Sequence, residues 1–215
     1  MTDYKFENIN IAFGADVVYK DFSIEFEKNK ITTILGRSGC GKTTLLNYIM
    51  KDILKYEDLS CVFQEESLVE WLTVRENINL VLRNRKVSKS EKEEIILKNL
   101  KLVNLDGYEN YYPAKLSGGM KQRVNIARAV SYSSDLLFMD EPFKSIDIIN
   151  KAEIIEKLKI EIKKSGQTTI VVSHDLDEAI DFSDNIICIS GGIEKKIKKF
   201  SINKYISKET LIKYI

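Results

Sequence analysis

A glycine-rich segment between two apolar stretches constrains this chain more than any other feature of its sequence. Residues 36–43 read Gly-Arg-Ser-Gly-Cys-Gly-Lys-Thr and directly follow the apolar run 31–35. The run before the glycines predicts a buried strand, and the apolar periodicity after them predicts a helix. A loop of this pattern, placed between a strand and a helix, is typical of phosphate binding, because backbone N–H groups and the helix N-terminus attract an anion. The sequence therefore predicts an α/β protein that binds a nucleoside triphosphate.

Two side chains of this loop carry specific expectations. Lys42 would reach the outer phosphates, and the Thr43 hydroxyl would ligate Mg²⁺. The residues expected to contact the nucleotide here are Gly36, Ser38, Gly39, Cys40, Gly41, Lys42, Thr43 and Thr44. By itself the loop leaves small-molecule kinases and GTPases open.

A second apolar stretch, residues 136–139, ends in the two carboxylates of Asp140 and Glu141. If this stretch is a buried strand, both acids lie at the carboxyl edge of a sheet, where doubly wound folds bind their ligands. Asp140 is then expected to hold Mg²⁺ together with Thr43. Glu141 is expected to face an attacking water as its general base.

Strand and helix signals alternate along the chain. Period-two apolar residues between Phe6 and Phe26 predict strands, and the alternation after residue 134 predicts a mostly parallel sheet with helices on both faces. Residues 73–103 are predicted to be helical, with a capping box from Ser88 to Glu91. We expect one domain over residues 1–215, with a P-loop NTPase (RecA-like) core at 1–66 and 134–215 and an inserted helical subdomain at 67–133.

Composition limits the classes of partner. Lys and Arg number 33 against 32 acidic residues, so the chain lacks the basic excess typical of nucleic-acid binding, and we expect no nucleic-acid partner. The lysines at 195, 196, 198 and 199 are expected to form a solvated face. The polar opening predicts no signal peptide, and no stretch approaches the roughly 20 apolar residues that span a bilayer. Three cysteines without short paired spacing predict reduced thiols in a cytoplasmic protein.

The segment 116–123, Leu-Ser-Gly-Gly-Met-Lys-Gln-Arg, closely resembles the signature motif of the ABC-type ATPases and precedes a predicted helix. The resemblance implies that Ser117, Gly118 and Gly119 contact a nucleotide held by the phosphate loop of a second copy. It implies a head-to-tail dimer with ATP between Lys42 of one copy and Ser117 of the other, and it disfavours a kinase. It also implies N-terminal strands that pair antiparallel.

Other positions match the same family. Gln64 resembles the family's glutamine that senses Mg²⁺ and the attacking water, His174 resembles the histidine that contacts the γ-phosphate, and Asp147 resembles the aspartate that crosses the dimer interface. Phe13 is expected to stack on adenine, although an aromatic there could also belong to the core. The resemblance implies a catalytic set and a metal set, namely Glu141, His174, Gln64 and Lys42 for catalysis and Thr43, Gln64 and Asp140 for the metal.

The stretch 62–78 looks most like the importer branch that handles nitrate, sulfonates, taurine and pyrimidine precursors. This implies an ATP-hydrolysing subunit on the inner face of the membrane, bound to an integral membrane permease and indirectly to an extracytoplasmic solute-binding protein. Two alternatives stay open: an ABC ATPase acting on nucleic acid or ribosomes, and the ATPase of an exporter. Trp71 would lie near the groove that receives the permease, or be a half-buried core residue.

The chain departs from the family in three places. The segment between Lys42 and Gln64 is shorter than usual, which removes part of the peripheral strand region. Lys144 stands where the family usually has a small residue, and Asn29 with Lys30 replaces a common Gly-Glu pair. The transported solute is not determined by this sequence.

Overall fold

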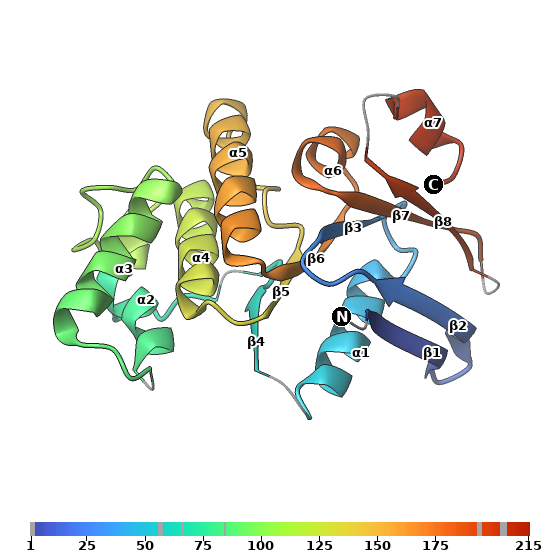
Figure 1. The fold of residues 1–215 in the computed structure, drawn as a ribbon, viewed down its shortest axis with the longest axis horizontal. Coiled ribbons are helices and arrows are strands. Elements are labelled where there is room, and N and C mark those ends of the chain that lie inside the picture. The colour runs from blue at the N-terminus through green and yellow to red at the C-terminus, as the bar shows by residue number, and fades with distance from the viewer. Residues whose placement is uncertain (1–2, 56–57, 66, 84, 193–194, 203–205) are drawn as a thin grey trace.

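The structure is a computed structural model, and it describes residues 3–55, 58–65, 67–83, 85–192, 195–202 and 206–215. Its strands are β1 (Tyr4–Phe13), β2 (Asp16–Phe26), β3 (Ile31–Leu35), β4 (Leu59–Val62), β5 (Leu136–Asp140), β6 (Thr168–Ser173), β7 (Asn185–Ser190) and β8 (Lys196–Ser201). Its helices are α1 (Lys42–Ile53), α2 (Val74–Leu82), α3 (Lys89–Leu102), α4 (Gly118–Tyr132), α5 (Ile148–Ser165), α6 (Leu176–Phe182) and α7 (Lys208–Ile212), with a short 3₁₀ turn η1 (Pro113–Lys115). Figure 1 shows the helices α2, α3 and α4 at one end of the molecule and β8 with α7 at the other.

The central sheet has the strand order β4-β5-β6-β3-β7-β8. All neighbouring pairs are parallel except β7 with β8, which is antiparallel. Strands β3, β5 and β6 are buried along their whole length, as expected for parallel strands covered on both faces. The segments that follow β3, β6, β5 and β4 therefore meet at one edge of the sheet, although they are far apart in sequence. The predicted mostly parallel α/β fold is confirmed.

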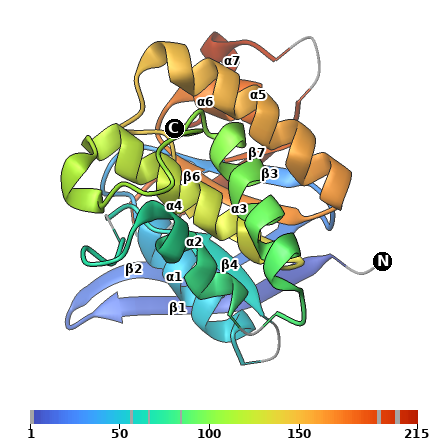
Figure 2. The same cartoon turned by 90° about the vertical axis from the view of Figure 1, so that its left-hand side faces the viewer.

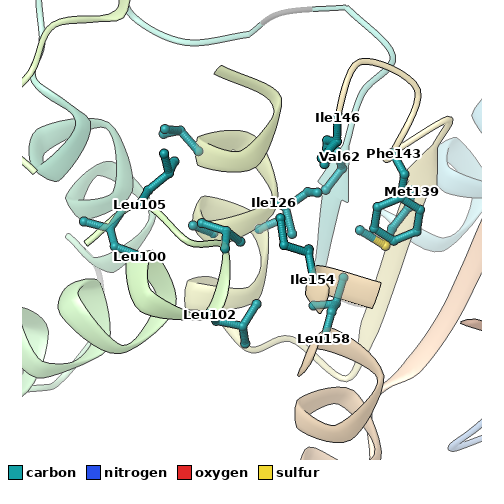
Figure 3. Close-up of a cluster of buried hydrophobic side chains, with 14 of the residues drawn as sticks. Val62, Leu100, Leu102, Leu105, Ile126, Met139, Phe143, Ile146, Ile154 and Leu158 are labelled. Atoms are coloured by element: carbon teal, nitrogen blue, oxygen red, sulfur yellow. The ribbon is translucent and has the colours of Figure 1, made fainter. Parts of the chain in front are cut away.

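Alternation along β5 divides the core into two clusters. Leu137 and Met139 face a cluster with α2 to α5, whereas Leu136 and Phe138 face a cluster with α1 and the β1–β2 ribbon. Figure 3 shows the first cluster, where side chains from α3, α4 and α5 meet those of the sheet. This packing fixes the carboxyl ends of the strands, because a slip of one residue in β5 would exchange its two apolar faces.

The antiparallel ribbon of β1 and β2 pairs Tyr4 with Phe26 and Phe13 with Asp16. It packs against α1, below the central sheet in the view of Figure 1. The predicted antiparallel N-terminal strands are confirmed, and in the described part of the chain this ribbon has two strands. The short segment between Lys42 and Gln64 leads from α1 almost directly into β4.

The stretch 73–103, which was predicted to be helical, contains the two helices α2 and α3. Each starts with a capping box, in which Thr73 pairs with Glu76 and Ser88 with Glu91. The second box was predicted from the sequence and is confirmed. Figure 2 shows α2, α3 and α4 side by side on the face turned toward the viewer. Among the described residues, no helix combines the length and the apolar character needed to cross a bilayer.

Candidate functional site

A cavity of about 350 Å³ lies at the carboxyl edge of the sheet. Its lining combines the loop after β3 with the residues that follow β4, β5 and β6, namely Ser38, Gly39, Gly41, Lys42, Thr43, Thr44, Gln64, Glu141, Lys144 and His174. A larger cavity of about 690 Å³, lined by Lys28, Asp135 and Thr168 among others, contains none of the predicted site residues. We therefore take the smaller cavity as the candidate site.

The loop after β3 is held in a conformation that requires its glycines. Gly41 has φ 96°, and a Cβ atom there would lie 2.7 Å from Val18 Cγ1. A Cβ atom on Gly36 would lie 2.7 Å from the carbonyl oxygen of Ile189. The loop is thus packed between β2 and the end of β7, and α1 begins directly after Gly41, so that its free N–H groups face the cavity.

Lys42 is buried, with 6% of its surface exposed. Its ammonium group donates to the carbonyl oxygens of Gly36 at 2.7 Å and of Arg37 at 3.0 Å. The ammonium group is thus held by the same loop that would receive the phosphates. A phosphate oxygen is a charged and therefore stronger acceptor, so it can replace these carbonyls.

Asp140 ends β5 as a buried carboxylate with 5% exposure. Its Oδ1 atom is buried without a hydrogen-bond partner. Burial raises the pKa of Asp140 above its ordinary value of 3.8, and a hydrogen bond with the Thr43 hydroxyl opposes the increase. An unpaired carboxylate oxygen beside a hydroxyl is a suitable donor set for Mg²⁺, which binds oxygen ligands. The residues therefore fit the predicted metal.

Glu141 and His174 meet across β5 and β6. The His174 Nδ1 atom lies 2.7 Å from Glu141 Oε1 and 2.9 Å from Oε2. Glu141 has φ 48°, which is strained for a residue with a side chain, and its N–H donates to the Val172 carbonyl at 2.9 Å. With this backbone conformation, the Glu141 carboxylate contacts the histidine at the cavity.

Other predicted residues lie outside the cavity lining. Phe13 is at the tip of the β1–β2 ribbon and is 64% exposed, which contradicts a place in the core. Ser117 caps α4 by accepting from the N–H of Met120 at 3.2 Å, and Asp147 caps α5 by accepting from the N–H of Asn150 at 3.1 Å. Ser117, Gly118, Gly119 and Asp147 do not line the cavity. The structure therefore assembles one set of predicted residues and leaves the signature set elsewhere on the surface.

Three contacts at the site were not anticipated. Lys144, which the sequence marked only as a departure from the family, lines the cavity. Lys195 was expected on a solvated face, but its ammonium group donates to the Cys40 carbonyl at 2.8 Å. Gln122 on α4 donates to the Pro142 carbonyl at 3.1 Å and ties the signature helix to the turn after Glu141. The separation of 155 residues between Cys40 and Lys195 explains why sequence patterns missed that contact.

Trp71 is 79% exposed, so the alternative of a half-buried core residue is wrong. A groove of about 400 Å³ lies along β4 and is lined by Leu59, Ser60, Cys61, Phe63, Leu80, Val81, Arg128, Ala129 and Tyr132. Trp71 is not part of this lining. Phe63, the residue directly before Gln64, is part of the lining.

Curated proteins resemble this chain over most of its length. The chain is 38% identical over 201 residues to the nitrate import ATP-binding protein NrtC of Synechocystis. This match covers 86% of this chain and 30% of that protein. It is 37% identical over 207 residues to the Fe(3+) ions import ATP-binding protein FbpC of Fusobacterium nucleatum, with 87% of this chain and 56% of that protein covered. The chain thus spans 30% of the length of the first of these curated relatives and 56% of the second.

Among solved structures, the dimeric structure of MJ0796, a bacterial ABC transporter cassette, superposes with a TM-score of 0.80 at 26% identity. That match covers 94% of this chain and 99% of the cassette. The family described as ABC transporter matches residues 19–144, from the second strand through the phosphate loop, the signature motif and the acidic end of β5. With more than half of its length matched, this chain belongs to the ABC transporter family.

Proposed function

We propose that this chain binds MgATP and hydrolyses it at two composite sites of a head-to-tail dimer, and that this cycle drives solute import through a separate membrane permease. The observation that carries the proposal is the division of the predicted residues into two sets. One set surrounds the cavity at Lys42, Glu141 and His174, while Ser117 stands apart at the exposed start of α4.

The two sets are complementary in chemistry. The cavity offers an ammonium group and the free N–H groups of α1, and α4 offers a second helix N-terminus. A triphosphate in the cavity of one copy would accept hydrogen bonds from Ser117 and the start of α4 of another. The dimeric cassette MJ0796 superposes over nearly the whole chain, which supports an assembly of this kind.

Within each site, the chain's own residues divide the chemistry of phosphoryl transfer. Lys42 would release its backbone carbonyls and bind the outer phosphates. Glu141 would accept a proton from the attacking water, and His174, already in contact with that carboxylate, would orient it beside the γ-phosphate. Thr43, Asp140 and Gln64 would hold Mg²⁺, which neutralises phosphate charge. Phe13 would stack on the adenine from the ribbon tip.

The permease is proposed to bind at the groove along β4. Its lining is apolar around Leu59, Phe63 and Val81, and Phe63 leads directly into Gln64 at the cavity. A partner helix in this groove would therefore be one residue away from a group that lines the nucleotide site. We place the chain on the inner face of the membrane through this contact.

The relatives suggest a solute class without fixing it. Their names assign nitrate, Fe(3+) ions and spermidine or putrescine to three proteins that are 38%, 37% and 36% identical to this chain. We propose a small solute of the nitrate or sulfonate type, delivered by an extracytoplasmic binding protein. Selectivity would reside in that protein and the permease, because the solute would contact them and not this chain.

The test is the substitution Glu141→Gln. It keeps the shape of the side chain but removes the base, so turnover should fall by roughly 10²–10⁴-fold while ATP binding persists. Size-exclusion chromatography with MgATP should then show a stable dimer. Glu156→Gln, an exposed position on α5 outside the cavity, serves as the control and should leave turnover unchanged. Unimpaired hydrolysis in Glu141→Gln would refute the assigned role.

A further inference from the structure

Lys144 occupies an unusual electrostatic position in the candidate site. Three cationic or potentially cationic side chains line the cavity, those of Lys42, Lys144 and His174. Lys42 is bound to two backbone carbonyls, and His174 contacts Glu141. Within the described part of the chain, the Lys144 ammonium group makes neither a hydrogen bond nor an ion pair. It is the lining cation that is available to a ligand without breaking an existing contact.

The backbone that carries Lys144 is nevertheless fixed. Its N–H donates to the Glu141 carbonyl at 3.3 Å, and the Ile146 N–H donates to the Phe143 carbonyl at 3.1 Å. Phe143 is buried and packs edge-on against Phe182 with ring centroids 5.2 Å apart. Figure 3 shows Phe143 and Ile146, which flank Lys144, among the side chains of the buried cluster. The lysine therefore projects from a rigid turn that also carries the catalytic candidate Glu141.

Lys144 lies in the same lining as the residues proposed to act on the terminal phosphate. It lines the cavity together with Glu141 and His174. Its N–H donates to the Glu141 carbonyl, and the Glu141 carboxylate contacts His174 Nδ1 at 2.7 Å. Because Glu141 and His174 are proposed to act on the attacking water and the γ-phosphate, an ammonium group in this lining would meet the terminal phosphate.

We propose that Lys144 contacts the terminal phosphate of bound ATP and sets the preference of this site for a triphosphate over a diphosphate. The inference rests on the proposed function, because it assumes that the cavity holds ATP. A flexible ammonium group can reach a phosphate oxygen without a fixed geometry. ADP lacks the phosphate at that end, so it gains little from this charge. The family usually has a small residue here, so the contact would be a property of this chain.

The experiment measures equilibrium binding of a non-hydrolysable triphosphate analogue, adenylyl imidodiphosphate, and of ADP, each with Mg²⁺. In Lys144→Ala the affinity for the analogue should fall by about tenfold, and that for ADP by less than about twofold. Lys144→Arg keeps the charge and should retain most of the affinity. Lys198→Ala removes an exposed lysine of β8 and should change neither affinity.

Equal losses for both ligands, or no loss for either, would overturn the proposal. A loss confined to protein concentrations at which the chain dimerises would also overturn it, because Lys144 would then act on the partner copy. Thermal unfolding of each variant checks that the fold is intact. Because no turnover is measured, a chain that binds the analogue but fails to hydrolyse ATP would refute the proposed function alone.

Discussion

The N-termini of α1 and α4, both proposed to bind phosphate, have opposite surroundings. At α1, Gly41 leaves the first N–H groups uncapped, and they face a cavity with Lys42 and Glu141. At α4, Ser117 caps the helix and stands on the exposed surface. The first helix start therefore lines a cavity, whereas the second lies on the exposed surface and, in the proposed dimer, would meet a phosphate held by another copy.

The first turns of the helices support this comparison. Helices α2, α3, α6 and α7 carry an acidic residue in the first turn, which complements their own partial positive charge. Neither α1 nor α4 does, and α5, which also lacks one, is capped instead by the carboxylate of Asp147. An acidic residue there would repel a phosphate, so both helix starts retain charge for an external anion. The two helix starts differ in their surroundings, because residues of other elements form a cavity around the start of α1 and leave the start of α4 exposed.

The largest effects are expected from two variants, each of which disables one of the two helix starts. Lys42→Ala and Ser117→Glu should each reduce turnover by roughly 10²–10³-fold, the first by losing a cation and the second by adding a charge that repels phosphate. Mixing the two variants should restore about a quarter of wild-type activity, because about half of the dimers are mixed and each keeps one intact site of two.

The control mixes Lys42→Ala with a chain that carries both substitutions. No mixed dimer then contains an intact site, so activity should stay at the level of the separate variants. Steady-state phosphate release measures both mixtures. If the first mixture also fails to recover, the two helix starts do not meet across copies, and the comparison is broken.

An intermediate effect, on stability, is expected from a substitution where α4 touches the turn after Glu141. A Cβ atom on Gly119 would lie 2.5 Å from the Ser145 carbonyl oxygen, so backbone must move in Gly119→Ala. Overpacking of this kind costs about 1–3 kcal/mol, which lowers the Tm by roughly 2–4 °C per kcal/mol. Gly192→Ala meets no atom within 4 Å and is the matched control for differential scanning calorimetry. An unchanged Tm in Gly119→Ala would show that α4 and this turn are not rigidly coupled.

The smallest expected effect concerns the stability of the nucleotide-free cavity. Burial raises the pKa of Asp140, so the folded state binds the proton more tightly than the unfolded state, and stability is lost as pH rises through the raised pKa. Asp140→Asn removes this cost and should raise the Tm at pH 7 by a few degrees, roughly 2–4 °C per kcal/mol. The gain should decline as pH falls and be absent below the ordinary value of 3.8. If the gain in Tm is equal at all pH values, it does not come from the ionisation of the Asp140 carboxylate.

The cavity side was predictable because its residues are tied to strand ends. Lys42 and His174 come after buried apolar strands and Asp140 ends one, and parallel strands bring their carboxyl ends to one edge. The capping box at Ser88 was predictable for a similar reason, since it depends on residues three apart. The position of Phe13 and the exposure of Trp71 were left open, because an aromatic residue suits both a core and a surface site.

The sequence by itself determined the fold class, the phosphate loop and the order of the chemical groups, because glycine spacing and strand periodicity are local properties. Only the tertiary structure decided that Lys144 faces the cavity, that Lys195 holds the Cys40 carbonyl and that Glu141 contacts His174. These contacts join segments that are distant in the chain or depend on the direction of one side chain. The physical reason is that long-range packing, which no local pattern encodes, sets those directions.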